Sequence, residues 1–312
     1  TGVQTCALPI SYFPSEYITV VEGGREENLQ LLNQHFDYIF FTGGTQVGKL
    51  VLEKASQNLT PVSLELGGKS PCIVDESANI KRGAKRIVFG KLLNAGQTCV
   101  APDYILVHRS IKDELICYMH DEIQKALGDD PIHHPDYPRI INEKHFDRLC
   151  AYLHQGTICC GGRMNRERLQ IEPTIMEVSD LHAKIMQEEI FGPILPVVTY
   201  DSLQEAIHFI HSKEHPLALY LFTTNREHEK KVLKECSFGG GCINDTIIHL
   251  ASSYMGFGGV GKSGMGAYHG YDSFLTFSHM RSIVKKSNLI DLPFRYYPYK
   301  KWKEQLMRKV MR

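Results

Sequence analysis

The feature that most constrains the fold of this chain is a repeated alternation of short β-branched or aromatic runs with helical stretches. The runs at 17–23 and 38–44 predict strands, and the stretches at 27–34, 46–57 and 80–92 predict helices. Such alternation is typical of an α/β protein with a largely parallel sheet. The sequence contains no internal repeat, low-complexity tract or Pro/Ser linker.

Composition narrows the classes of function. The 312 residues are 43% hydrophobic and 22% charged, enough for a sizeable core and about two domains. Lys plus Arg and Asp plus Glu both number 35, so no net charge attracts a polyanion, and we expect no nucleic acid partner. No uncharged apolar run reaches the roughly 18 residues that span a bilayer. The nine cysteines have no disulfide-framework spacing. We therefore expect reduced thiols, a cytoplasmic location and no bound metal ion.

A glycine-rich turn follows the predicted strand at 38–44. Thr42, Gly43 and Gly44 lead into the helix that holds Val47 and Gly48. Glycine lets a backbone approach a ligand closely, and a helix N-terminus offers unpaired N–H groups to a pyrophosphate. This turn predicts dinucleotide binding.

A competing phosphate motif lies near the C-terminus. Residues 256–263, GFGGVGKS, satisfy the P-loop pattern G-x-x-x-x-G-K-[ST] and would suggest a nucleotide hydrolase. A P-loop needs a buried strand before it and a helix after it, whereas seven glycines between 256 and 270 disfavour a helix. We keep the hydrolase as an alternative.

Two residues have the chemistry of a catalytic pair. Alternation in the run TPVSLELGGKSP predicts a strand whose apolar face is opposite Glu65, and a carboxylate at a strand end suits a general base. An ordinary solvated glutamate is the plainer interpretation. Cys99 follows a helix broken by Asn94 and Gly96, so it is expected on a loop, where a thiol is free to react. Most of the other cysteines are expected to be inert and buried.

Taken together, five motifs resemble the aldehyde dehydrogenase superfamily. They are FTGGTQVGK, LELGGKSP, NAGQTCVAPDYIL, QEEIFGP and MGFGGVGKSGMGAYHG, in that order over about residues 17 to 285. APDYIL, SGMGAYHG and FLTFSH resemble the class 3 branch. Motifs in the right order are more specific than any one alone. In this family the GFGGVGKSG segment is a loop beside the active site, which would explain the P-loop match.

The resemblance implies a role for each candidate residue. Cys99 would be the nucleophile that forms a thiohemiacetal and then a thioester, and Glu65 the base. Glu189 would hold the nicotinamide ribose and Phe191 would pack near the ring, whereas Glu188 is expected to be a solvated neighbour. Phe257 would line a pocket for an apolar aldehyde. The cofactor, NAD or NADP, would lie along Thr42, Gly43, Gly44, Thr45, Gln46, Val47 and Gly48.

The resemblance also implies a domain organisation. Residues 1–10 match the translation of a sequencing adaptor and are expected to be a non-native scar. Residues 11–66 would be the C-terminal part of a Rossmann-type cofactor domain, 67–275 a catalytic domain, and 276–312 a bridging strand, within 276–284, with a basic tail. The rest of the cofactor domain, and an Asn that donates to the oxyanion, would precede this chain. We therefore expect the fragment itself to be inactive.

Three further expectations concern partners and alternatives. The class 3 resemblance implies a homodimer. The tail RYYPYKKWKEQLMRKVMR would form a helix with one apolar side, either in weak contact with a membrane surface or docked on its own subunit. Besides the hydrolase, a dinucleotide-binding relative without turnover is the alternative to an aldehyde-oxidising enzyme.

Overall fold

The computed structural model describes residues 12–292 and 295–311. The expected scar at 1–10 lies outside the described residues. The chain divides into two compact units, one that ends at Phe277 and one that begins at Ser278. The second unit contains the helix α10 (Lys301–Val310). Among the described residues, no helix is long and apolar enough to cross a membrane.

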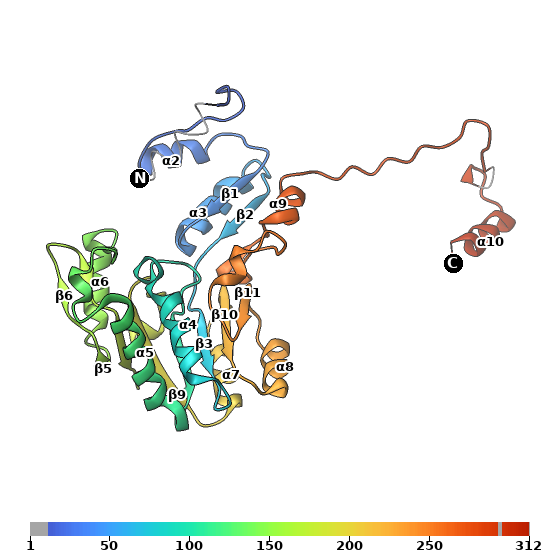
Figure 1. Ribbon diagram of the computed structural model, residues 1–312. Helices are drawn as coiled ribbons and strands as arrows, with labels where there is room; N and C mark the ends of the chain where they lie inside the picture. Colours follow the sequence, from blue (N-terminus) through green and yellow to red (C-terminus); the bar gives the residue numbers. More distant parts are fainter. Residues whose placement is uncertain (1–11, 293–294, 312) are drawn as a thin grey trace. The chain divides into compact units, whose positions relative to one another are not determined.

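A small sheet opens the first unit (Figure 1). Its strand order is β1-β2-β12, with β1 and β2 parallel and β12 antiparallel to β2. Apolar residues of the helix α3 and of β2, Val51 and Leu64 among them, form its core together with Leu66. The elements of this part are α2 (Arg25–Leu32), β1 (Ile39–Thr42), α3 (Thr45–Ser56), β2 (Val62–Glu65) and β12 (Gly264–Met265).

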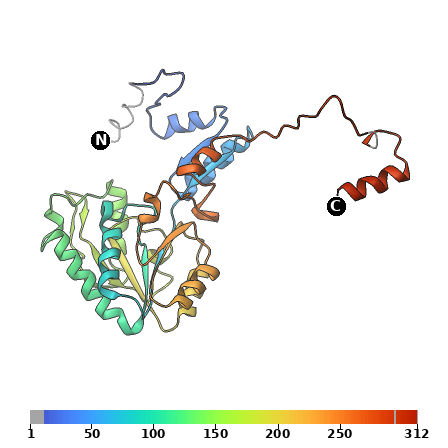
Figure 2. The same ribbon diagram turned by 45° about the vertical axis from the view of Figure 1, so that its right-hand side comes forward.

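A seven-stranded sheet carries the rest of the unit, in the order β11-β10-β3-β4-β9-β8-β5 (Figures 1 and 2). All neighbours are parallel except β5 and β8. The strands are β3 (Pro71–Val74), β4 (Tyr104–His108), β5 (Thr157–Cys160), β8 (Thr174–Glu177), β9 (Ile194–Tyr200), β10 (Ala218–Phe222) and β11 (Gly240–Ile243).

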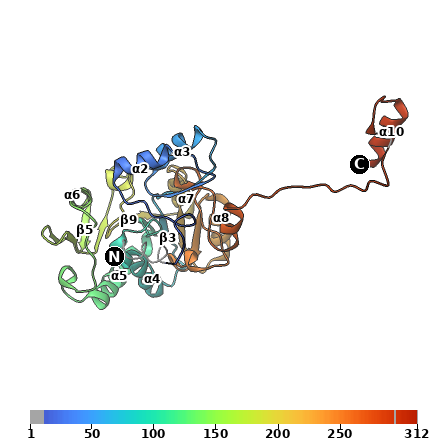
Figure 3. The same cartoon turned by 90° about the horizontal axis from the view of Figure 1, so that it is seen from above.

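Helices cover both faces of this sheet because the strands are apolar on both sides. In β3, Ile73 joins one core cluster, while Cys72 and Val74 join the other. The second cluster includes residues of α4 and α5, which lie side by side (Figure 3), and the first includes residues of α6, α7 and α8. These helices are α4 (Ile80–Leu92), α5 (Lys112–Leu127), α6 (Glu143–Tyr152), α7 (Leu203–His211) and α8 (Arg226–Glu235).

Short elements complete the first unit. A two-stranded ribbon and the helix α9 lie outside the two main sheets, and single 3₁₀ turns join longer elements. These elements are β6 (Met164–Asn165), β7 (Gln170–Ile171), α9 (Gly270–Thr276), η1 (Leu93–Gly96), η2 (Arg109–Ile111), η3 (Pro131–His133), η4 (Lys184–Met186), η5 (Ile248–Ala251) and η6 (Gly261–Ser263).

The α/β prediction is confirmed, with two local corrections. The predicted strand at 38–44 and the helices at 27–34, 46–57 and 80–92 match β1, α2, α3 and α4. No strand forms at 17–23 or 276–284. Neither segment has a hydrogen-bonded neighbouring strand within the described residues of this single chain, and β-prone sequence forms a strand only when such a neighbour is present. Gly67, the predicted domain boundary, lies between β2 and β3, which belong to different sheets.

Candidate active site

Glu65 ends β2 between two neighbouring strands, opposite Thr42 of β1 and Gly264 of β12. It is only 4% exposed, so the plainer interpretation of a solvated glutamate is wrong. The 256–266 segment lies against β2, since β12 pairs with it and Gly266 is close to the Ser63 side chain. Neither carboxylate oxygen of Glu65 has a hydrogen-bond partner among the described residues. Burial raises the pKa of this carboxyl group to about 8.

The glycines of the 256–266 loop allow that close approach. A Cβ on Gly264 would lie 2.4 Å from the Leu64 carbonyl oxygen, and one on Gly266 would lie 2.4 Å from Ser63 Oγ. Only the three-residue turn η6 and the short strand β12 follow the glycine-rich run, where a P-loop would have a helix. The P-loop alternative is therefore wrong, and Gly264 and Gly266 serve packing against β2.

Cys99 lies on a turn that follows three consecutive left-handed residues. Asn94, Ala95 and Gly96 have φ values of 51°, 51° and 71°. Such strain in non-glycine residues persists only where surroundings hold it. Gln97 fixes the turn, since its side chain accepts from the Ile141 N–H at 2.9 Å and donates to the Arg139 carbonyl at 3.1 Å.

The Cys99 turn lies against the segment that carries Glu189. A Cβ on Gly96 would lie 2.2 Å from the Gly192 carbonyl oxygen, so the two backbones are in contact. Cys99 is partly buried, and its thiol pKa is raised to about 11, first by burial, then by the negative charges of Glu189 and Glu65. The structure thus brings together three residues that the sequence predicted for the site.

Glu189 is fixed from several directions. Its carboxylate lies against Gly67, where a Cβ would be 2.0 Å from Oε2. Arg148 donates to the Glu189 carbonyl at 2.9 Å and to the Ile190 carbonyl at 2.6 Å. Burial, with the charge of Asp103, raises the pKa of Glu189 to about 8. The neighbouring Glu188 is exposed, as expected, although it accepts a hydrogen bond from Tyr152.

Sequence reasoning missed the residues that hold this segment. Lys69 forms an ion pair with Asp103 and donates to the Ile185 carbonyl at 2.7 Å and the Glu188 carbonyl at 3.0 Å. Asp103 accepts from the Ile190 N–H at 2.8 Å. Lys69 lies in the motif LELGGKSP and Asp103 in the motif APDYIL. Their place in these two motifs was the sequence signal that could have identified them. They are positioning residues, because they act through the backbone around Glu189.

The N-terminus of α3 supplies a second part of the site. Gly43 donates to the Glu65 carbonyl at 2.9 Å, and Gly44 caps the helix with open space where a Cβ would be. Gly48 lies against Leu66, where a Cβ would be 2.6 Å from the side chain. Thr45 and Glu189 line one cavity of about 330 Å³. Thr45 and Glu189, which two motifs far apart in the sequence predicted for cofactor binding, therefore line the same cavity.

Of the other residues predicted for the site, Phe257 lies near Cys99 and Glu65, whereas Gln46 and Val47 line a separate hollow. Phe257 is buried, stacks on His269 at 5.4 Å, and lies 5.8 Å from the Tyr268 ring. The pKa of Tyr268 is raised by burial and by Glu65 and Cys99, so this aromatic cluster borders the pair. Phe191 is left-handed, with a φ of 49°. Gln46 and Val47 line a different hollow, an apolar groove of about 840 Å³ bordered by α2, β1 and α3.

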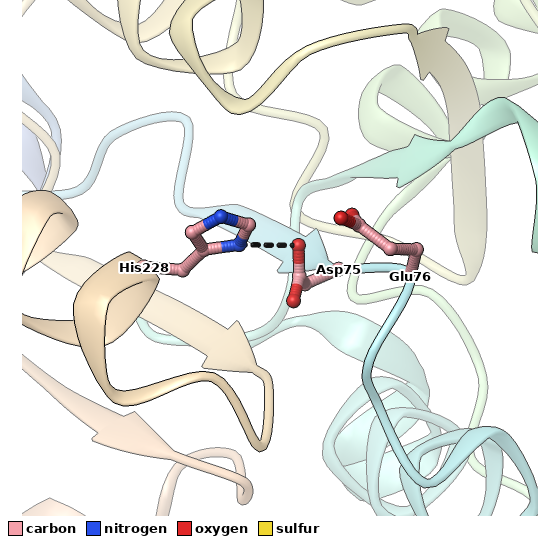
Figure 4. Close-up of side chains that lie close together, drawn as sticks. All are labelled: Asp75, Glu76 and His228. Atoms are coloured by element: carbon pink, nitrogen blue, oxygen red, sulfur yellow. Dashed lines mark hydrogen bonds and ion pairs between the residues drawn. The ribbon is translucent and has the colours of Figure 1, made fainter.

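A separate cluster of three side chains lies at the C-terminal end of β3 (Figure 4). Asp75, Glu76 and His228 each place one possible metal-ligand atom within 4.8 Å of the others. Asp75 is fully buried and accepts from Ser77 Oγ at 2.6 Å, Thr223 Oγ1 at 2.8 Å and His228 Nδ1 at 2.9 Å. Since protein donors already surround its carboxylate, the cluster serves to join β3 to the segment between β10 and α8.

The fold and the grouping of the Cys99 thiol with the carboxylates of Glu65 and Glu189 fit a dehydrogenase, and comparison with known proteins identifies the family. The chain belongs to the aldehyde dehydrogenase family, whose model matches residues 7–283. It is 52% identical over 290 residues to 4,4'-diaponeurosporen-aldehyde dehydrogenase of Staphylococcus aureus, covering 92% of this chain and 63% of that protein.

Two further comparisons bear on class and fold. Aldehyde dehydrogenase family 3 member A2 of Rattus norvegicus is 47% identical over 88% of this chain and 57% of its own length, which confirms the class 3 resemblance. The substrate-bound structure of Staphylococcus aureus AldH matches with a TM-score of 0.93 and 50% identity, over 97% of this chain and 66% of its own. The chain thus spans about three fifths of the length of these relatives.

Proposed function

We propose that the protein containing this chain oxidises aldehydes to carboxylic acids with NAD⁺ or NADP⁺, through a covalent intermediate on Cys99. One observation carries the proposal: both oxygens of the Glu65 carboxylate are buried without a partner, beside a thiol on a strained turn. A buried polar group without a partner costs stability, so it is expected where function requires it. Family membership supports the same reaction.

The first step is addition of Cys99 Sγ to the aldehyde carbon. The C–S bond forms, the thiol proton passes to Glu65, and the carbonyl oxygen becomes an oxyanion to which the Cys99 N–H donates. The thiol pKa is about 11 and that of Glu65 about 8, so this proton transfer costs about 4 kcal/mol in the free site. Bound NAD⁺ or NADP⁺ supplies the hydride acceptor and a positive charge that stabilises the thiolate.

Hydrolysis of the resulting thioester needs a base. Glu65 first releases to solvent the proton that it took from Cys99. It then takes a proton from water as the water oxygen attacks the thioester carbon, and passes it to the departing Cys99 thiolate as the C–S bond breaks and the acid is released. The raised pKa of Glu65 suits this role because a base with a pKa near the working pH is the most efficient.

The residues present fit a dinucleotide. The first-turn N–H groups of α3, capped by Gly44, have no carbonyl partner within the helix and carry partial positive charge suited to phosphates. Thr45 and Glu189 line the same cavity, so a ligand on the helix N-terminus also reaches the carboxylate proposed to hold the nicotinamide ribose. Gln46 and Val47 face the apolar groove instead, so we propose that they contribute backbone rather than side-chain contacts.

The proposal extends to substrate and partners. The aromatic cluster around Phe257 favours an apolar aldehyde. We propose a homodimer, which β11 supports as an edge strand of the seven-stranded sheet. The helix α10 has exposed Trp302 and Val310 among basic residues, and weak contact with a membrane surface remains our proposal for it, as does a cytoplasmic location for the protein.

The test is turnover of the intact protein. With an aldehyde and NAD⁺ or NADP⁺, reduced nicotinamide absorbance should appear, and Cys99→Ala should lower its rate by about 10³-fold or more. Cys117→Ala, at an exposed cysteine of α5, is the matched control and should keep full activity. Full turnover in Cys99→Ala would overturn the covalent mechanism. Saturable dinucleotide binding without turnover on a panel of aldehydes would favour the non-catalytic relative.

A further inference from the structure

Two adjacent cysteines, Cys159 and Cys160, end the edge strand β5 of the seven-stranded sheet. In a regular strand, neighbouring side chains point to opposite faces of the sheet. Adjacent cysteines in such a strand cannot act on the same ligand. The pairing of β5 with β8 is not regular, however.

A β-bulge lies between Ile158 and Cys160. Thr157 pairs with Glu177 and Ile158 with Met176, but Cys160 pairs with Ile175, so Cys159 is the extra residue. Directly opposed residues in an antiparallel pair share a face of the sheet. Because Glu177 and Ile175 lie on the same face of β8, Thr157 and Cys160 also share that face.

Cys159 lies on that face as well. Its Sγ is 3.9 Å from Glu177 Oε1. Glu177 belongs to the face that also contains Ile175, opposite Cys160. The bulge therefore puts two thiols on one face, on consecutive residues whose Cα atoms are about 3.8 Å apart. The pKa of the Cys160 thiol is raised mainly by burial, and the charge of Cys159 raises it further. This effect of Cys159 agrees with two sulfur atoms that lie near each other.

The surroundings leave the pair accessible. Cys159 is exposed and Cys160 partly buried, and both are free thiols. Cys160 also lines a small polar cavity of about 110 Å³ with His120 and Glu172. The two glycines after the pair, Gly161 and Gly162, have φ values of 80° and 93°, so the chain turns away directly after Cys160. Since β5 is an edge strand, no further strand of the described residues lies beside the pair.

We propose that Cys159 and Cys160 form a dithiol site that binds trivalent arsenicals through both sulfur atoms. In the reaction, R–As(OH)₂ and two thiols give R–As(S–Cys)₂ and two water molecules. Two As–S bonds form and two As–O bonds break, each thiol proton leaves with a hydroxyl group as water, and arsenic stays trivalent. The site is separate from Cys99 and does not depend on the proposed oxidation of aldehydes.

The test uses the whole chain with phenylarsine oxide as the probe. Intact mass measurement in excess 2-mercaptoethanol should show one phenylarsenic group retained per chain, because a monothiol competes poorly with a chelating pair. Addition of 2,3-dimercaptopropanol should remove it. Cys159→Ser and Cys160→Ser should each lower retention by at least 10-fold, whereas Cys117→Ser and Cys99→Ser should keep it.

Two outcomes would overturn the proposal. One is full retention in Cys159→Ser, and the other is loss of the adduct in Cys99→Ser but not in the β5 variants. Cys160 packs partly against the core, so circular dichroism of each variant must match that of the parent chain. Because Cys159 is exposed, Cys159→Ser tests the site without disturbing that packing.

Discussion

Two buried carboxylates, Glu65 at the end of β2 and Asp75 just after β3, show opposite ways of placing a charge inside this protein. Glu65 is 4% exposed and has no hydrogen-bond partner within the described part of the chain, and burial raises its pKa to about 8. Asp75 is 0% exposed. Burial alone would raise its pKa, but side-chain hydrogen bonding, first with Glu76 and then with Ser77, Thr223 and His228, lowers it to about 2.

The difference in hydrogen bonding suits the two carboxylates to different roles, one to proton transfer and the other to stabilising the fold. A carboxylate without partners is ready to take a proton from a thiol or a water molecule, at a cost to the folded state. A carboxylate that accepts several hydrogen bonds stays ionised and holds its neighbours in place. Glu65 ends β2 near Cys99, and Asp75 follows β3 in the other sheet, so we expect buried carboxylates to serve proton transfer in one place and folding in the other.

The largest effect is expected for Glu65→Gln. This change removes the base while keeping the shape of the side chain, so turnover should fall on the order of 10²- to 10⁴-fold in steady-state assays. In the parent protein, turnover should rise with pH through about 8 as Glu65 ionises, and this rise should be absent in the variant. A variant with the parent's turnover and pH profile would exclude Glu65 as the base.

The same variant should be more stable than the parent in mild alkali. The pKa of Glu65 is higher in the folded than in the unfolded protein, so its ionisation lowers stability progressively as pH rises from about 4.5 to about 8. Above that range, Glu65→Gln should gain on the order of 2 kcal/mol in urea unfolding. No gain at pH 8.5 would mean that the carboxylate has partners in solution.

Asp75→Asn should lower the stability of the folded protein and leave turnover nearly unchanged, the reverse of the effects expected for Glu65→Gln. Loss of the charge weakens three hydrogen bonds in a buried site, so the free energy of unfolding should fall by about 2–4 kcal/mol, with turnover of the folded protein changed less than about threefold. The pKa is lower in the folded state, so the contribution of Asp75 is present above about pH 4 and is lost as pH falls toward 2. The stability difference between parent and variant should therefore shrink in acid.

Glu114→Gln is the control for that prediction. Glu114 is an exposed carboxylate of α5 outside this cluster, and its substitution should change stability by less than about 0.5 kcal/mol. An equal loss in both variants would show that net charge, and not the hydrogen bonds of Asp75, stabilises the protein.

The contrast also shows what a sequence can reveal. Alternation predicted β2, and the motif around it identified Glu65, because strand period and motif order are local properties. Burial of Glu65 was not predictable, since the loop that covers β2 comes from 256–266. No local motif indicated the role of Asp75, because its partners Thr223 and His228 lie about 150 residues away.

The corrections have the same physical origin. The run at 17–23 has strand propensity but no neighbouring strand among the described residues, and propensity does not supply a partner. GFGGVGKS has the composition of a phosphate loop, but its glycines Gly258 and Gly259 allow the segment to pack closely on its own residues 263–267, and Gly264 and Gly266 just after it pack against Leu64 and Ser63 of β2. In both cases contacts far apart in sequence decided the outcome.

The smallest effect is expected for Gly67→Ala, which tests how closely the site is built around Glu189. A Cβ there would lie 2.0 Å from Glu189 Oε2, so the carboxylate must move away from the cavity it shares with Thr45. We expect the KM for NAD⁺ or NADP⁺ to rise on the order of 10-fold, about 1.4 kcal/mol, with kcat changed less. Glu189→Ala, which removes the carboxylate altogether, should raise the KM at least as much. If Gly67→Ala lowered kcat and left KM unchanged, the displaced group would be acting on Cys99 rather than on the cofactor.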